Sequence, residues 1–128
     1  MDLLDWTKIH VRHQDLLKKR IEKIQEHNDS LTIHNKDGTQ ETWLVQERLD
    51  LTNTNVKAIV TLNTKKNLKT LIQRYKDVKE SPVKIFFANP KTNDRWVLVP
   101  SHHTRVADQK NLKAGLESMA QSTPFLKE

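Results

Sequence analysis

The chain has 128 residues, a formal net charge of +6 at pH 7 and no cysteine. This length is typical of one domain with its own core, and the lack of cysteine excludes disulfide bonds, thiolate catalysis and cysteine zinc sites. No apolar run reaches the roughly eighteen residues of a membrane-spanning helix. No basic-then-apolar leader is present, so we expect a cytoplasmic protein that does not contact a membrane.

Residues 1–28 predict one long N-terminal helix. Apolar positions recur at steps of three and four, as they do on one face of a helix. A polar stretch at residues 27–30 ends the pattern. The residues on the predicted face are Leu3, Trp6, Ile9, His13, Leu17, Ile21 and Ile24.

A β-hairpin is expected next. Residues 31–35 and 41–47 are rich in β-prone side chains and flank a short turn. Asp37 and Gly38 lie in that turn, where glycine readily adopts the positive φ that a tight hairpin needs. We therefore expect two antiparallel strands.

Residues 56–100 form the central unit of the predicted fold. Three apolar runs predict strands at residues 56–62, 83–88 and 96–99. Residues 65–79 place apolar side chains at helical spacing, which indicates a crossover helix between two parallel strands. Turn-forming residues at 89–94 predict a hairpin between the last two strands.

The end of the chain predicts a loop at residues 101–105 and a final helix with Asp108 as its N-cap. Residues 123–128 are expected to be a tail that folds back or stays loose. The predicted fold is a single mixed α/β domain over residues 1–128, in the order α-β-β-β-α-β-β-α. We expect a mixed sheet of about five strands with helices on both faces.

The positive charge is concentrated in the second half of the chain. Residues 63–128 carry thirteen Lys or Arg and six Asp or Glu, whereas the first 62 residues are close to neutral. A basic face is typical of proteins that bind an anionic partner, with nucleic acid the first candidate. A solvated surface without a partner explains the same charge, and both interpretations stay open.

The candidate phosphate contacts lie on the crossover helix and just after the last strand. Lysines at helical spacing share one side of the helix, and the N–H groups at its start favour an anion. Loop histidines beside basic residues can contact phosphate or carry a proton. The nucleic-acid-binding candidates are Lys65, Lys66, Lys69, Lys76, His102, His103 and Arg105.

Metal-dependent cleavage is the alternative chemistry. It needs acids that converge on Mg²⁺, with a lysine near the attacking water. Glu47 and Asp50, three residues apart at a strand end, are the weak catalytic candidates, with Lys65 or Lys66 as the lysine. The six histidines lack HExxH spacing, so we expect no resident metal and no cofactor.

The strand at residues 83–88 and the sequence RWVLVP at residues 95–100 look like the end of the PD-(D/E)xK nuclease core. The element order over residues 30–105 also resembles that superfamily, and the archaeal Holliday-junction resolvases in particular. The family carries Glu-x-Lys on its third strand, where this chain has Thr61 and Asn63. The resemblance implies a nucleic-acid-binding relative whose cleavage chemistry is lost or relocated.

A second, partial likeness is to the double-stranded RNA-binding domain. Residues 64–69 (TKKNLK) resemble the lysine-rich start of its second helix, although the later strands and the long first helix depart from it. We therefore expect a small module that binds DNA or RNA through phosphate contacts and is not an enzyme. The alternatives are a metal-dependent nuclease of the restriction-endonuclease-like type and a protein-interaction or subunit domain. A homodimer stays open.

Overall fold

The computed structural model describes residues 1–106 and 111–127, with the backbone alone for residues 105 and 106. None of the helices in these ranges is both long enough and apolar enough to cross a membrane. The elements in chain order are α1 (Leu3–Asp15), β1 (Ile21–Glu26), β2 (Ser30–Asn35), β3 (Gln40–Gln46), β4 (Ala58–Leu62), α2 (Lys65–Val78), β5 (Lys84–Asn89), β6 (Asp94–Leu98), α3 (Pro100–Val106) and α4 (Leu112–Gln121).

The strands form one mixed sheet in the order β1-β2-β3-β4-β5-β6, so every strand lies beside its sequence neighbour. The first three strands are antiparallel, β3, β4 and β5 are parallel, and β6 returns antiparallel to β5. The predicted mixed α/β class is confirmed. The sheet has six strands rather than about five, because β1 was expected to be helical.

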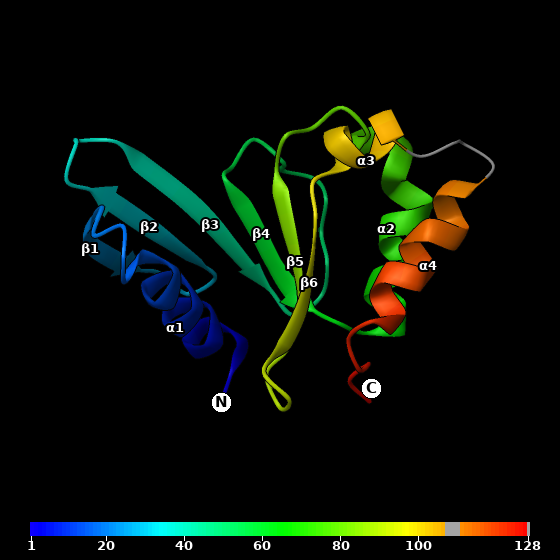
Figure 1. Ribbon diagram of the computed structural model, residues 1–128, viewed down its shortest axis with the longest axis horizontal. Helices are drawn as coiled ribbons and strands as arrows, with labels where there is room; N and C mark the ends of the chain where they lie inside the picture. Colours follow the sequence, from blue (N-terminus) through cyan, green and yellow to red (C-terminus); the bar gives the residue numbers. More distant parts are fainter. Residues whose placement is uncertain (107–110, 128) are drawn as a thin grey trace.

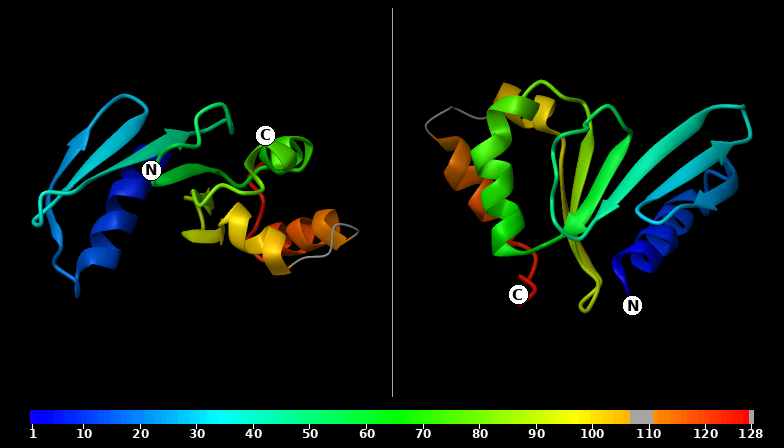
Figure 2. Two further views of the ribbon diagram at one scale, coloured as in Figure 1. Left: turned by 90° about the horizontal axis from the view of Figure 1, so that it is seen from above. Right: turned by 180° about the vertical axis from the view of Figure 1, so that it is seen from behind.

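Helices cover both faces of the sheet, as predicted. Ala58 and Val60 of β4 belong to the same buried cluster as Leu3 and Trp6 of α1. Ile59, between them, belongs to the cluster that includes side chains of α2 and α4. Successive strand residues point to opposite faces, so β4 is apolar on both. Figure 1 shows α1 beside β1–β3 and the pair α2 and α4 at the opposite end of the twisted sheet, and Figure 2 shows the same arrangement from two further sides.

The central β4-α2-β5-β6 unit is confirmed. Helix α2 is the crossover between the parallel strands β4 and β5, and a tight turn joins β5 to β6. Trp96 is buried, with 5% of its surface exposed, and its ring stacks on Phe87 at a centroid distance of 4.3 Å. Gly38, in the β2–β3 turn, has φ of +89°, in agreement with the expected hairpin geometry.

The prediction of one helix over residues 1–28 is wrong. Helix α1 ends at Asp15, whose carboxylate accepts hydrogen bonds from the N–H groups of Arg20 (2.9 Å) and Ile21 (3.1 Å). Lys19, between Asp15 and Arg20, has φ of +50°, so the chain reverses there and enters β1. The buried face of α1 is also different from the predicted one. It consists of Leu3, Trp6, Thr7, His10 and Val11, whereas Ile9 and Leu17 are exposed.

A β-bulge explains why the periodicity of residues 21–24 looked helical. Residues three apart in a regular strand face opposite sides of the sheet. The register of β1 against β2 shifts between Ile21 and Lys23, and this extra residue brings Ile21 and Ile24 to the same face. Both side chains pack against the α1 side of the core. A bulged strand therefore reproduces the spacing of one helical turn.

The C-terminal segment also differs from expectation. Residues 101–105, predicted as a loop, belong to helix α3, and the predicted N-cap Asp108 lies outside the described residues. The tail is packed over the part that the structure describes. Thr123 is buried, and the N–H of Leu126 donates to the carbonyl of Asn63 over 2.9 Å.

Candidate nucleic-acid interface

Helix α2 is held firmly against the sheet. Thr64 caps its start by accepting a hydrogen bond from the N–H of Asn67 over 3.1 Å. The Asn67 side chain is buried and bonds to two earlier segments of the chain: its Oδ1 accepts from Leu49 N–H, and its Nδ2 donates to the carbonyls of Glu47 and Leu62. The buried stripe of α2 consists of Leu68, Leu71, Tyr75 and Val78. The opposite side of a rigid helix is thereby fixed toward solvent.

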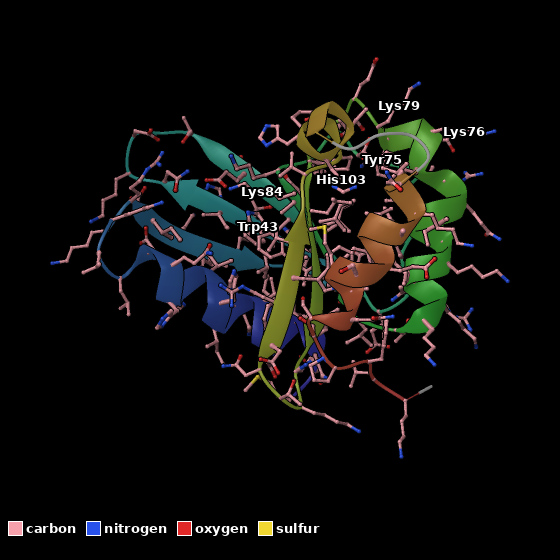
Figure 3. The ribbon with its side chains drawn as sticks, turned by 45° about the vertical axis from the view of Figure 1, so that its right-hand side comes forward. Trp43, Tyr75, Lys76, Lys79, Lys84 and His103 are labelled. Atoms are coloured by element: carbon pink, nitrogen blue, oxygen red, sulfur yellow. The ribbon has the colours of Figure 1, made fainter. Side chains whose placement is uncertain are left out.

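Three lysines form a row on that solvent side. Lys65, Lys69 and Lys76, which we call the lysine row, are all exposed. At 100° per residue they fall within about 40° of one another around the helix axis, and Gln73 lies between the last two. Figure 3 shows Lys76, with Lys79 just beyond the helix end, pointing away from the body of the molecule. The structure therefore brings these candidates together.

The lysine row is not neutralised by carboxylates of the described residues, since none of its three members forms an ion pair there. Asp77, the only acidic residue on α2, pairs with Arg74 at 3.4 Å. Lys66 is exposed in the first turn and interacts within the fold. The uncompensated charge of the helix is therefore that of the row itself.

The α3 candidates are placed less favourably for phosphate. The Tyr75 hydroxyl of α2 donates to the Pro100 carbonyl over 3.0 Å and lies 2.9 Å from Thr104 Oγ1, and these contacts hold α3 beside the end of α2. His103 lies edge-on to Tyr75 at 6.2 Å, with its Nε2 buried and without a hydrogen-bond partner in the described structure. Burial lowers the pKa of His103, so its neutral form is favoured. His102 is exposed, and the Arg105 side chain lies outside the described residues.

Close packing against α4 accounts for the position of His103. A Cβ on Gly115 would lie 3.6 Å from the imidazole carbon Cε1, which is ordinary van der Waals distance, so the ring lies directly against this part of α4. Sequence reasoning assigned His103 to a loop and could not foresee this contact, because it depends on the packing of α3 against α4. The structure thus places His103, a half-buried residue, against Tyr75 and α4 and not in the lysine row.

The acidic candidates do not converge on a metal position. Glu47 and Asp50 are both exposed, and hydrogen bonds from the side chain and N–H of Thr52 hold the pKa of the Asp50 carboxyl below its usual value. Among the residues that the structure describes, no group of three or more His, Asp or Glu side chains is arranged to hold a metal ion. The geometry therefore offers no support for the nuclease alternative.

Thr61 and Asn63, which occupy the place of Glu-x-Lys in the nuclease resemblance, are completely buried. Thr61 Oγ1 accepts a hydrogen bond from Asn67 Nδ2 over 3.0 Å, and Asn63 bonds to Trp96 and to the C-terminal tail. Both side chains serve the fold. They are not exposed to a substrate.

A groove beside the lysine row was not anticipated from the sequence. It has a volume of about 480 Å³ and runs between α2 and α4, with Lys65 and Lys69 on one wall and Lys113 and Glu117 on the other. Leu68, Ile72 and Phe125 supply its apolar surface. Lys113 pairs with Glu117 at 3.9 Å. The sequence predicted both helices but carried no signal for their mutual packing.

Comparisons with protein-family models, curated proteins and solved structures found no match for this chain. The resemblance to the PD-(D/E)xK superfamily stays a prediction.

Proposed function

We propose that this chain is a small cytoplasmic nucleic-acid-binding module that contacts the phosphate backbone through the lysine row of α2. The observation that supports this most strongly is the exposed, unpaired alignment of Lys65, Lys69 and Lys76 on one side of a rigid helix. A cation that is not neutralised inside the protein is available to displace counterions from a phosphate.

The dimensions of the row suit a phosphate chain. Lys65 and Lys76 are eleven residues apart, which corresponds to about 16 Å along a helix axis. Phosphates follow one another at about 3.4 Å of axial rise per strand, so the row spans several of them. Such contacts position a protein on nucleic acid without reading its sequence. We therefore propose binding to DNA or RNA with little sequence preference, by a protein that is not an enzyme.

The start of α2 supports the same interpretation. Its first turn contains no acidic residue, and the helix dipole adds a partial positive charge near Lys65. An anion that lies along the row would therefore meet attraction from both the side chains and the helix terminus. This second contribution is smaller and falls off within one turn.

The test is the salt dependence of binding. Wild-type protein should bind a duplex or a single strand at low salt, and its affinity should fall steeply as salt rises. The double variant Lys65→Gln/Lys69→Gln keeps the helix and its apolar stripe, so folding should hardly change. Its slope of log K against log salt should be smaller than the wild-type slope by about 2 on B-form DNA.

Lys23→Gln/Lys91→Gln is the matched control, because it removes the same charge from exposed positions outside α2. An equal change of slope in both double variants would mean that net charge, and not the row, drives binding. Absence of nucleic-acid binding by the wild-type protein at low salt would contradict the proposal.

A protein-interaction domain is the second candidate, and the α2–α4 groove favours it. Leu68 and Ile72 meet Phe125 there, so an apolar surface is open beside the lysines. A protein ligand would bury this surface and show a weak salt dependence, whereas phosphate contacts show a strong one.

A further inference from the structure

A second basic site lies on the other side of the molecule, between the C-terminal end of α1 and the starts of β3, β4 and β5. It is a pocket of about 210 Å³. Figure 3 shows Lys84 and Trp43 in this region, well apart from Lys76 and Lys79. Its basic lining residues are Lys18, Arg20, Lys57 and Lys84, and its acidic lining residues are Asp15 and Glu41.

Backbone pairing brings two of its lysines together. The N–H of Lys57 donates to the carbonyl of Thr42 over 3.0 Å, and the N–H of Lys84 donates to the carbonyl of Lys57 over 3.2 Å. Lys57 and Lys84 are therefore neighbours at the starts of adjacent parallel strands. Trp43 and Ile33 are buried behind them, with 6% and 2% of their surfaces exposed, so the wall of the pocket is rigid.

The carboxylates of the pocket are already engaged. Both oxygens of Asp15 accept backbone N–H groups at the end of α1. Glu41 accepts from Asn35 Nδ2 at 3.0 Å and from Trp43 Nε1 at 3.5 Å. Each acid thus has a structural partner that is not a lysine.

The basic side chains outnumber these acids. Lys18, Arg20, Lys57 and Lys84 line the pocket against two carboxylates. Lys18, Lys57 and Lys84 form no ion pair within the described part of the chain. The C-terminus of α1 adds about half a negative charge. Arg20 also interacts electrostatically with Asp37. The net charge around the pocket is still positive.

We propose that this pocket binds a phosphomonoester group, held by Lys57 and Lys84 with Lys18 and Arg20 on the opposite wall. Cations from separate chain segments that converge on a concave site favour a compact, multiply charged anion over an extended one. The volume corresponds to about seven water molecules, which accommodates a phosphate with part of a sugar but not a duplex. The site is independent of the lysine row.

Two sources could supply this group: a free sugar phosphate and the 5′-phosphate at the end of a nucleic-acid strand. Titration with inorganic phosphate at constant ionic strength, followed by ¹H–¹⁵N NMR, tests the site itself. We expect saturable shifts in the millimolar range at the amides of Lys57 and Lys84 and at the indole N–H of Trp43. The indole signals of Trp6 and Trp96 are internal references, because neither residue lines the pocket.

Lys57→Gln/Lys84→Gln should weaken phosphate binding at least tenfold, since it removes two charge-assisted hydrogen-bond donors. Both positions are exposed, so the Trp96 indole signal should stay in place and report an intact fold. The matched variant Lys23→Gln/Lys91→Gln should bind phosphate as the wild type does. Linear, non-saturating shifts, or equal weakening in both double variants, would overturn the proposal.

Binding of two kinds of probe distinguishes the two sources. The first is ribose 5-phosphate, and the second is a short single strand that carries either a 5′-phosphate or a 5′-hydroxyl. A gain in affinity from the 5′-phosphate that disappears in Lys57→Gln/Lys84→Gln assigns the pocket to strand ends. Saturation by ribose 5-phosphate without such a gain assigns it to a free phosphate compound. Because Lys65→Gln/Lys69→Gln leaves this pocket intact, failure of the lysine row as a nucleic-acid site would not remove phosphate binding here.

Discussion

Trp96 donates a hydrogen bond from Nε1 to Oδ1 of Asn63 over 2.9 Å, although the two residues are 33 positions apart in the sequence. Both are buried, Asn63 completely. The Asn63 amide also donates to the carbonyls of Thr123 (3.0 Å) and Pro124 (3.2 Å). One side chain at the end of β4 therefore joins β6 and the C-terminal tail to the centre of the sheet.

This network predicts a coupled loss of stability. Asn63→Ala should lower the free energy of unfolding by about 2–4 kcal/mol, because it leaves the Trp96 N–H and tail carbonyls without partners. Trp96→Phe should cost about 1–3 kcal/mol for the same reason. The double variant should lose less than the sum of the two, since the shared bond is removed only once. Urea unfolding followed by circular dichroism measures all three.

Gln73→Ala, on the exposed side of α2, is the control and should change stability by no more than about 0.5 kcal/mol. Strictly additive losses in the double variant would show that the Trp96–Asn63 hydrogen bond contributes nothing.

The second prediction concerns the contribution of the C-terminal tail, residues 123–128, to stability. Truncation after Ser122 removes buried Thr123, the Pro124 carbonyl that also accepts from Asn89 over 3.0 Å, and the packing of Phe125. We expect a loss of about 2–4 kcal/mol, seen as a lower midpoint in urea. Truncation after Leu126 removes the exposed Lys127 together with Glu128 and should leave the midpoint unchanged. Equal midpoints for both truncations would mean that the tail does not stabilise the sheet.

The sequence predicted the parts of the fold that depend on local pattern. Successive residues of β4 and β5 are apolar, so both faces of these strands are apolar, and Asp37-Gly38 marks a hairpin turn. The predictions of the central unit and of the β2–β3 hairpin were therefore correct. The lysine row followed from helical spacing alone. These features need no knowledge of distant contacts.

Contacts between distant segments account for features that local sequence pattern did not show. Asn63 and Asn67 are polar residues beside a strand end and a helix start, yet both are buried by segments far away in the chain. His103 was placed in a loop for the same reason. The pocket around Lys57 and Lys84 also depends on strand pairing, which residue types alone do not specify.

The third prediction concerns cleavage. The protein should leave duplex, branched and single-stranded DNA intact in the presence of Mg²⁺ or Mn²⁺, because Glu47 and Asp50 belong to no metal-binding cluster of the described residues. Gel analysis over hours at high protein concentration measures this. Metal-dependent cleavage that Glu47→Gln or Asp50→Asn abolishes would instead support the nuclease alternative.

The last prediction concerns His10, which is buried on the sheet side of α1 with 8% of its surface exposed. Its ring stacks on Trp6 at 5.0 Å, meets Phe86 edge-on at 5.3 Å, and has a buried Nε2 without a partner in the described structure. Burial, with smaller contributions from Arg95 and His13, lowers the pKa of His10 from 6.5 to about 4. The folded protein therefore favours the neutral ring.

The sign of the pH effect follows from this pKa. Between pH 6.5 and pH 4 the unfolded chain binds a proton at His10 that the folded chain does not bind, so stability falls as the pH is lowered through this window. Well above pH 6.5 the residue is neutral in both states and contributes no pH dependence. The loss should approach about 3 kcal/mol near pH 4.

His10→Phe keeps an aromatic ring on Trp6 and removes the titrating group. Urea unfolding at pH 7.5 and at pH 4.5 should show a smaller acid loss in this variant than in the wild type, by about 2–3 kcal/mol. His102→Gln, at an exposed position, should keep the wild-type pH dependence. An NMR titration that places the His10 pKa near 6.5, or equal acid losses in wild type and His10→Phe, would contradict the buried, neutral state.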